Sequence, residues 1–595
     1  MLINYIIFVS NKNFNKMQFT PSEYQKAIFD FIRHGSGNAV INAKAGSGKT
    51  TTLVEAMKLL PEKDKALFVA FNKAIANELE KKVKDLKNVK VRTYHGLGYA
   101  IFRENYGNKS EIQEYKYTSF INKNINRLSS DAEALGRKKF KLYKQNVKQL
   151  VDFARYNLAQ SSEEIFNLCK KYSIEVLHDE CEVVPKILEW GKTNLDSIDY
   201  TDMVWVCVEN QLETRNMKFD YIFIDEAQDS SIMQQALIKK CFKRGTRFVA
   251  IGDEFQCINA FAGADSEAFN KFKKEVNTTL LKLPISYRCP SKVIKYVKEA
   301  TGVEMEVAPN AIEGDIKFDV SPFAPVSGDM VLCRNTAHLV KLYMKYVKIN
   351  KKAYLKGRSI AESFKSYIEN TDKERLSLDM IEDGVFPRLY ERLFDTIVMM
   401  MERDGLDFED AINTRIIMDM IDSIKALEAL AEGIVWTKDL LKKIDVIFTD
   451  DDEDGVCLST IHKAKGLEAD NVFILCDSLM PSKFATKKWE IESEQNLIYV
   501  ALTRPKKCLH YICEKQFPAN LYGENKDVIS DLEYMKTRME RALKRKYTLP
   551  NDVLKETEIK KDVKNLLNTH NIGARVVNEK KRQNVGGNKF AKFLK

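Results

Sequence analysis

The sequence predicts an α/β protein with two mostly parallel sheets, each interrupted by a mainly helical insertion. Three observations predict this fold class. Short apolar runs alternate with amphipathic helical runs, as expected for parallel sheets covered by helices. A glycine-rich turn that ends in Lys49-Thr50 stands between a buried apolar run and a helical run. Over 104–196 and again over 369–450, strand signals fade and polar helical patterns dominate.

The first alternating part begins with an amphipathic helix, which we expect over 19–34 because Pro21 and Gln25 lie in its first turns. Strands follow at 39–41, 66–70 and 89–93, with helices at 51–57 and 73–83. After the first insertion, further strands are predicted at 221–224, 247–251, 330–333 and 472–475. Strands that alternate with helices in this way favour parallel pairing.

The turn over 43–50 is typical of a phosphate-binding loop. Gly46 and Gly48 let main-chain N–H groups point inward, and the following helix N-terminus adds partial positive charge. Lys49 would then reach the β- and γ-phosphates, and the Thr50 hydroxyl would ligate Mg²⁺. Ala43 replaces the usual first glycine. A chance glycine turn is the alternative, but the flanking strand and helix favour a nucleotide site.

A second group of polar residues follows the strand predicted at 221–224. Strand ends in a parallel sheet converge where ligands bind, so Asp225 and Glu226 are expected near the phosphate-binding loop. Asp225 would hold Mg²⁺, and Glu226 would position and deprotonate the attacking water. Cations must also balance the charge on the γ-phosphate, and Arg288 and Arg504 are candidates. An arginine taken alone is more often a partner in a surface ion pair.

Composition limits the class of protein without deciding it. The chain has 595 residues, 44% hydrophobic residues and a net charge of +10, which suits either a polyanion partner or a lysine-rich solvated surface. Its 11 scattered cysteines indicate a reducing cytosol, and we expect Cys508 and Cys513 to be packed strand residues rather than metal ligands. The apolar start, 1–10, is too short to span a membrane. We therefore expect a cytoplasmic protein, and the abundant Lys, Asn and Ile indicate an AT-rich genome, as in a bacterial or phage-infected cell.

These patterns divide the chain into six parts. They are an N-terminal extension (1–16), a first α/β domain (17–103 and 197–283), its helical insertion (104–196), a second α/β domain (284–368 and 451–516), its helical insertion (369–450) and a basic C-terminal tail (517–595). Lysines and arginines over 137–148 in the first insertion fit a solvated helix face or a contact with a nucleic-acid backbone equally well.

An ordered series of short segments resembles the motifs of the UvrD/Rep/PcrA helicases of superfamily 1, over nearly all of 19–509 apart from the insertions. The segments are 43–50 (A-x-A-G-S-G-K-T), 71–74 (T-N-K-A), 93–96 (T-F-H-G), 199–203 (D-F-D-D-L), 225–229 (D-E-x-Q-D), 252–256 (G-D-x-x-Q), 261–264 (W-R-G-A), 287–288 (N-Y-R-S), 460–468 (T-I-H-K-A-K-G-L-E) and 499–504 (Y-V-A-L-T-R). Within that family, 71–76 and 225–229 are similar to the F-box DNA helicase-like branch, although no F-box is apparent.

The resemblance implies two RecA-like domains with ATP and Mg²⁺ in the cleft between them. Residues implied in binding ATP are Gln25, Ala45, Gly46, Ser47, Gly48, Lys49, Thr50, Thr51, Tyr287 and Glu468, and Gln256, Arg288 and Arg504 are implied at the γ-phosphate. Residues implied in binding DNA are Asn72, Lys73, Thr93, Tyr94, His95, Phe261, Thr460 and His462. Thr51 departs from the family's usual arginine, which leaves adenine recognition to Gln25 and Tyr287.

The resemblance also implies a function. We expect an ATP-dependent DNA helicase that moves 3′ to 5′ on single-stranded DNA and at junctions with duplex, in repair, recombination or replication. One alternative is a translocase that displaces bound proteins and unwinds poorly. Another is a DNA-binding scaffold without hydrolysis, which the intact Lys49, Glu226 and Arg504 disfavour. An RNA substrate stays open because backbone contacts discriminate poorly. A nuclease activity is disfavoured, because no carboxylate cluster of nuclease type follows Phe517.

Overall fold

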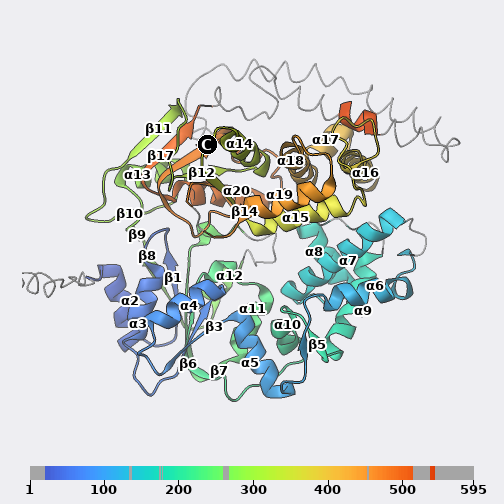
Figure 1. Ribbon diagram of the computed structural model, residues 1–595. Helices are drawn as coiled ribbons and strands as arrows, with labels where there is room; N and C mark the ends of the chain where they lie inside the picture. The colour runs from blue at the N-terminus through green and yellow to red at the C-terminus, as the bar shows by residue number, and fades with distance from the viewer. Residues whose placement is uncertain are drawn as a thin grey trace, which may run out of the picture.

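The computed structural model describes residues 20–132, 137–172, 174, 176, 179–258, 267–451, 454–513 and 537–542. It consists of two parts stacked one above the other (Figure 1). We call residues 20–283 the N-terminal half, and residues 284–513 with 537–542 the C-terminal half. Each half is built around one parallel sheet, which confirms the predicted α/β class.

The N-terminal half contains a six-stranded sheet in the order β3-β2-β6-β7-β1-β8. Its strands are β1 (Asn38–Ala43), β2 (Ala66–Ala70), β3 (Val89–Thr93), β6 (Phe219–Ile224), β7 (Phe242–Gly252) and β8 (Thr278–Leu283). All neighbouring pairs run parallel. The carboxyl ends of β1, β6 and β7 therefore lie together at one edge, where ligands bind in such sheets.

The C-terminal half contains a seven-stranded sheet in the order β11-β17-β16-β12-β15-β13-β14, also parallel throughout. Its strands are β11 (Asp315–Val320), β12 (Met330–Cys333), β13 (Ala353–Lys356), β14 (Phe448–Thr449), β15 (Val456–Thr460), β16 (Ala469–Leu475) and β17 (Pro505–Ile512). A separate two-stranded ribbon of β9 (Ile285–Ser286) and β10 (Glu306–Val307) lies where the chain enters this half.

Helices cover the first sheet and form its insertion. Those of the alternating part are α2 (Glu23–His34), α3 (Lys49–Met57), α4 (Lys73–Lys82), α5 (Tyr94–Tyr106), α10 (Asp202–Glu209), α11 (Ile232–Lys240) and α12 (Ala268–Lys274). Those of the insertion are α6 (Lys116–Leu128), α7 (Arg137–Asn157), α8 (Ser162–Tyr172) and α9 (Glu180–Thr193), beside the short pair β4 (Glu111–Ile112) and β5 (Ser197–Ile198). The insertion shares one apolar core with a face of the sheet, through residues such as Tyr117 and Ile187.

The second insertion is likewise joined to its sheet rather than set apart from it. The helices of this half are α13 (Ser291–Thr301), α14 (Thr336–Lys348), α15 (Arg358–Glu369), α16 (Val385–Asp404), α17 (Phe408–Ile412), α18 (Arg415–Leu430), α19 (Thr437–Ile447) and α20 (Lys488–Leu502). A single core contains Val331 of β12 together with Phe386 of α16 and Leu427 of α18. Met539 and Ala542, in the region predicted to be a basic tail, are buried in the same core.

Most of the predicted elements are confirmed. The strands predicted at 66–70, 89–93 and 330–333 match β2, β3 and β12 in both bounds. The first helix begins later than predicted, at Glu23, because Ser22 caps it and Gln25 returns the contact in a capping box. All 11 cysteines are free, and Cys508 lies in β17 as predicted, with Cys513 just after its end. No helix in the described ranges is long and apolar enough to cross a membrane.

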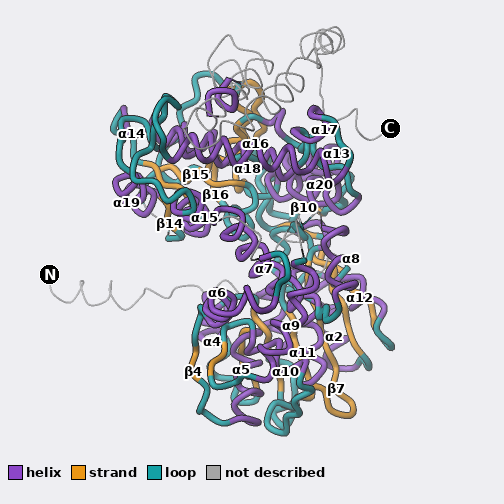
Figure 2. Tube along the Cα trace, turned by 90° about the vertical axis from the view of Figure 1, so that its right-hand side faces the viewer, coloured by secondary structure: helices purple, strands orange, loops and turns teal. Residues whose placement is uncertain are grey.

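Besides an exposed hydrogen bond between Tyr24 and Glu306, two junctions join the described residues of the two halves. One lies at the carboxyl edge of the first sheet and is described below. At the other, α8 of the first insertion contacts the start of α20, and α8 lies at the boundary between the halves in both views (Figures 1 and 2). Trp489 donates its indole N–H to the carbonyl oxygen of Lys171 at 2.8 Å, and Lys487 Nζ donates to that of Lys170 at 2.5 Å. The Trp489 ring also lies against Tyr172, with centroids 5.6 Å apart.

Candidate nucleotide and DNA site

The phosphate-binding loop has the local structure that its sequence predicts. It leaves β1 after Ala43 and enters α3 at Lys49. Gly46 and Gly48 both have left-handed conformations, with φ of 72° and 76°. A Cβ at Gly46 would lie 2.6 Å from the Cβ of Arg288, which belongs to the other half. Gly46 is therefore required both by its conformation and by the close approach of the C-terminal half.

The donors of this loop fit a phosphate group. The Ser47 side chain is buried, and its Oγ has no hydrogen-bond partner among the described residues. Buried polar atoms without a partner are uncommon, and they often mark the place of a ligand. The first N–H groups of α3 also lack partners within the helix, and Lys49 stands at the same end. These groups together match the charge and hydrogen-bonding needs of a nucleotide phosphate.

Lys49 forms an ion pair with the residue predicted to be the catalytic base. Its Nζ lies 2.8 Å from Glu226 Oε1, and both side chains are largely buried. Burial and the neighbouring Glu226 raise the pKa of Asp225. Despite its burial, Glu226 has a pKa below the usual range, because Lys49 and Lys465 stabilise its charge. Glu226 is therefore ionised, as a general base must be.

The main chain at Glu226 is strained. Its φ and ψ of 49° and 44° place a non-glycine residue in the left-handed region. Such conformations are costly and cluster at functional sites, where the surrounding structure enforces them. The Glu226 N–H is bonded to Asp225 Oδ1 at 2.9 Å, and Gln228 Nε2 donates to Glu226 Oε2 at 2.5 Å. The first bond holds the main chain, and the bond from Gln228 together with the ion pair to Lys49 fixes the direction of the Glu226 carboxylate.

Asp253 and Gln256 follow β7, next to the phosphate-binding loop. Asp253 is fully buried, and its Oδ2 accepts a hydrogen bond from Gln256 Nε2 at 2.9 Å. The Asp253 N–H donates to Gln228 Oε1 at 3.1 Å, which links this turn to the one that carries Glu226. Gln256, the predicted γ-phosphate sensor, is thus held on Asp253 in this structure.

Several side chains of the C-terminal half reach into this edge, and two of them, Tyr499 and Lys465, were not among the predicted site residues. Tyr499 accepts a hydrogen bond from the Ala45 N–H and donates one to Asp253 Oδ2, both at 2.9 Å. Lys465 forms an ion pair with Asp229 and donates to the Gln256 carbonyl oxygen at 2.6 Å. Both residues lie within segments that carry the family resemblance, and this was the available signal.

Arg288 lies at the same edge and is paired with Glu468. Its Nε lies 2.6 Å from Glu468 Oε2, and Lys506 contacts the other oxygen of the same carboxylate at 2.8 Å. The main chain next to Arg288 also touches the loop, because the Tyr287 N–H donates to the Gly46 carbonyl oxygen at 2.9 Å. The structure thus brings together the loop, the predicted arginine and the predicted ribose ligand.

Arg504 is placed differently from Arg288. It is only 1% exposed, and its guanidinium donates to the carbonyl oxygens of Val500 and Leu467 and to the Thr503 hydroxyl. Burial and the nearby Arg288 lower its pKa to about 10. In this structure Arg504 therefore links segments within the C-terminal half. It could contact a phosphate only if these hydrogen bonds were broken.

The predicted adenine side is partly occupied by protein contacts. Gln25 is buried, and its Nε2 donates to Thr52 Oγ1 at 2.9 Å while its Oε1 accepts from the Ser22 N–H at 3.0 Å. Tyr287 is 49% exposed, as a residue that stacks on a ligand would be. Thr51 is exposed at the first turn of α3.

The predicted DNA-binding residues fall into three groups. Asn72 and Lys73 at the start of α4, together with His95 in the first turn of α5, are exposed, and Thr93 is half-buried as the cap of α5. Tyr94 is only 2% exposed because α5 turns it into the core, which argues against a side-chain contact with DNA. Thr460 is buried and His462 half-buried in the C-terminal half. Phe261 lies outside the described residues.

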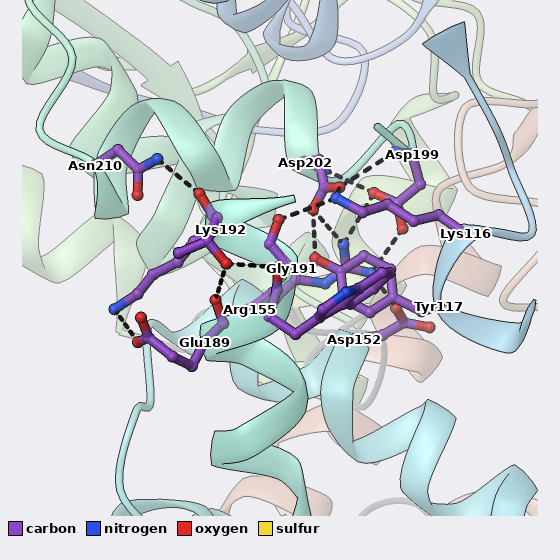
Figure 3. A network of polar contacts seen from close by, with 12 residues as sticks. Lys116, Tyr117, Asp152, Arg155, Glu189, Gly191, Lys192, Asp199, Asp202 and Asn210 are labelled. Carbon is purple, nitrogen blue, oxygen red and sulfur yellow. Dashed lines mark hydrogen bonds and ion pairs between the residues drawn. The ribbon is translucent and has the colours of Figure 1, made fainter. Parts of the chain in front are cut away.

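A buried polar network links helices α6 and α7 of the first insertion to Asp199 and Asp202 (Figure 3). Arg155 of α7 is paired with both Asp199 and Asp202 at 2.9 Å. Lys116 and Tyr117 of α6 contact the same Asp202, each at 2.7 Å. A charge-assisted network of this kind favours a single arrangement, although Arg155 Nε has no hydrogen-bond partner among the described residues. The segment over 199–203 thus positions the insertion, and Asp199 is close enough to His95 to interact with its charge.

Comparison with known proteins agrees with this geometry. The UvrD/REP helicase N-terminal domain matches residues 24–277, and the UvrD-like helicase C-terminal domain matches 455–511. F-box DNA helicase protein 1 of Schizosaccharomyces pombe is 27% identical over 506 residues, or 79% of this chain and 55% of that protein. This chain therefore spans just over half of that relative.

Two bacterial relatives are also similar. ATP-dependent DNA helicase Rep of Buchnera aphidicola (subsp. Acyrthosiphon pisum) is 21% identical over 83% of this chain and 95% of that protein. ATP-dependent DNA helicase PcrA of Bacillus subtilis is 23% identical over 45% of this chain and 38% of that protein. The helicase of an arterivirus, nonstructural protein 10, has a TM-score of 0.30, which is too low to carry an argument. The family models and the curated relatives show that the chain belongs to the UvrD/Rep/PcrA-type family of ATP-dependent DNA helicases.

Proposed function

We propose that the protein couples ATP hydrolysis to 3′-to-5′ movement along single-stranded DNA and acts at junctions with duplex, in repair, recombination or replication. The observation that carries this proposal is the edge where Lys49 contacts Glu226 and where Tyr499, Lys465 and Arg288 approach from the other half. A nucleotide bound there would contact both halves at once.

The residues of this site support a distinct role for each in hydrolysis. Thr50 and Asp225 would hold Mg²⁺, which when bound would neutralise phosphate charge. When ATP binds, the Lys49 ammonium group leaves Glu226 and contacts the phosphates, because it cannot bind both groups fully at once. Glu226, whose charge Lys465 still stabilises and whose carboxylate Gln228 aligns, then accepts the proton of the attacking water. Arg288 adds positive charge from the C-terminal half, where Glu468 aligns it.

Movement follows from the difference between the two nucleotide states. A ligand shifts a conformational equilibrium only by the difference in its affinity for the two conformations. ATP favours the closed arrangement, since Arg288 reaches the phosphates only when the halves are together. Loss of phosphate removes that contact and lets the halves separate. Stacking of bases on aromatic side chains would hold the strand at about 1–3 kcal/mol per base without regard to sequence.

A second candidate function is displacement of bound proteins with little unwinding. One observation favours it: the second insertion shares a continuous core with the second sheet, through Phe386, Leu427 and Val331. An insertion fixed in this way cannot swing as a separate unit during unwinding. Release of a protein roadblock from single-stranded DNA, compared with opening of a forked duplex, separates the two candidates.

The proposal is tested by ATP hydrolysis with and without single-stranded DNA. We expect DNA to stimulate the wild-type protein, and Glu226→Gln to lose about 100-fold or more in kcat while it still binds ATP. Glu254→Gln is a matched control, since Glu254 follows the neighbouring strand but is bonded to Lys273 and Asn42. Hydrolysis that is unchanged in Glu226→Gln would overturn the assignment of the base, and no hydrolysis by the wild type would favour a scaffold.

A further inference from the structure

Tyr499 of the C-terminal half bonds through its side chain to the main chain of the phosphate-binding loop. It lies near the end of α20 and is only 1% exposed. Its hydroxyl has one proton, which it donates to Asp253 Oδ2, and its oxygen accepts the N–H of Ala45. The same hydroxyl thus holds two turns of the N-terminal half, one after β1 and one after β7.

The Asp253 carboxylate connects this contact to Gln256. Its Oδ2 accepts both the Tyr499 hydroxyl and the Gln256 amide, each at 2.9 Å. Burial raises the pKa of Asp253, and these two donors, with Lys44 and Lys49, favour its charged form. Removal of either donor makes the buried Asp253 carboxylate depend more on the other donor, because a buried carboxylate is costly to leave with fewer partners.

We propose that Tyr499 is a positioning residue for hydrolysis, which reports closure of the two halves to Gln256 through the shared Asp253 carboxylate. When the halves separate, the Tyr499 hydroxyl leaves, and Asp253 and the Ala45 N–H lose their partner. When they close, the hydroxyl returns and resets the bonding of Gln256. Unlike Arg288, Tyr499 acts through protein groups and not through the phosphates. This inference rests on the proposed function, because it concerns the same site.

The change that tests this relay is Tyr499→Phe. It removes the hydroxyl and keeps the ring packed against Phe255, whose centroid lies 6.0 Å from that of the Tyr499 ring in the wild-type structure. We expect the DNA-stimulated kcat to fall about tenfold, because a hydrogen bond to a charged group is lost. The Kd for a fluorescent ATP analogue should change less than about twofold, since the loop and Lys49 remain. A variant that is only less stable is not expected to lose kcat while its Kd for the analogue stays the same.

Tyr511→Phe is the matched control. Tyr511 is a buried tyrosine of the same apolar core, but it lies in β17 and its ring stacks on Phe318. Thermal melting of both variants shows whether they fold, and we expect Tyr511→Phe to keep the wild-type kcat. Equal losses of kcat in the two variants would attribute the effect to general packing and would overturn the relay.

A double-mutant cycle with Gln256→Ala asks whether Tyr499 acts through Gln256. If it does, Tyr499→Phe should reduce kcat by less than about twofold once Gln256 is absent, because coupled residues are not additive. Losses that multiply, or a Tyr499→Phe protein with the wild-type kcat, would overturn the relay while the proposed function stands. A wild-type protein without DNA-stimulated hydrolysis would overturn both.

Discussion

The two junctions between the halves are built from different chemistry. The junction at the sheet edge is polar: Tyr499 is bonded to Ala45 and Asp253, and Lys465 is paired with Asp229. The junction at α8 is mainly aromatic, with Trp489 against Tyr172 and with main-chain carbonyl oxygens as the acceptors. The first is made by groups that surround the predicted phosphates, and the second lies on the insertion.

This difference indicates which junction a nucleotide can control. Under the proposed function, Lys49, Glu226 and Arg288 would change partners when phosphates bind, so the strength of the sheet-edge junction would depend on the ligand. The contact of Trp489 with α8 contains none of the predicted nucleotide ligands. We therefore expect the α8 junction to hold the halves together while the sheet-edge junction opens and closes.

The largest expected effect comes from Lys49→Ala. This change removes the cation that faces the phosphates and leaves Glu226 without its 2.8 Å partner. Hydrolysis should fall about 100-fold or more. Lys58→Ala, at the other end of α3, is the control, because Lys58 is exposed and paired only locally with Glu55 in the described structure. Similar losses in both variants would mean that the helix, and not the site, was damaged.

The next effect is that of Lys465→Met, which removes the ion pair with Asp229 across the sheet-edge junction. Closure should become less favourable by about 1–3 kcal/mol, which is about 5- to 150-fold in kcat. Adding Asp229→Asn to Lys465→Met should restore part of the activity, because the buried charge is then absent. A double variant that is worse than Lys465→Met would contradict an electrostatic role for this pair.

Trp489→Ala should affect the other junction. Loss of the aromatic contact with Tyr172 should weaken the junction by about 1–2 kcal/mol and speed amide hydrogen exchange in residues 162–172. ATP hydrolysis without DNA should stay within about threefold of the wild type. Trp436→Ala is the matched control, because Arg375 lies over the Trp436 ring as Arg415 lies over that of Trp489, but Trp436 is remote in sequence from α8. Unchanged exchange in Trp489→Ala would show that this contact is not needed to hold the halves.

The smallest effect is expected for Tyr24→Phe. The Tyr24 hydroxyl donates to Glu306 Oε1 at 2.5 Å, but this bond is exposed to solvent. Water replaces such a bond easily, so the free energy of unfolding should be nearly unchanged. Urea denaturation measures this change. A larger loss would mean that the contact between α2 and β10 is a third functional junction.

The sequence predicts the parts of this site that depend on neighbouring residues. Strong apolar runs give β2 and β12, alternation of apolar and polar residues gives β3, and glycine spacing gives the turn between β1 and α3. The contacts between halves could not be derived from local patterns, since Ala45 and Tyr499 are 454 residues apart. Edge strands such as β8 were missed because they alternate exposed and partly buried residues and have no long apolar run. The core that the second insertion shares with its sheet could likewise not be predicted, because it depends on contacts between residues far apart in the sequence.

The most direct test of the account is strand displacement on duplexes with either a 3′ or a 5′ single-stranded tail, with ATP, Mg²⁺ and matched RNA tails. We predict that the wild-type protein opens the 3′-tailed DNA duplex, that Glu226→Gln does not, and that Trp489→Ala opens it with a changed yield but the same polarity. Opening of both duplexes without ATP, or equal opening by Glu226→Gln, would contradict a motor driven by the sheet-edge junction.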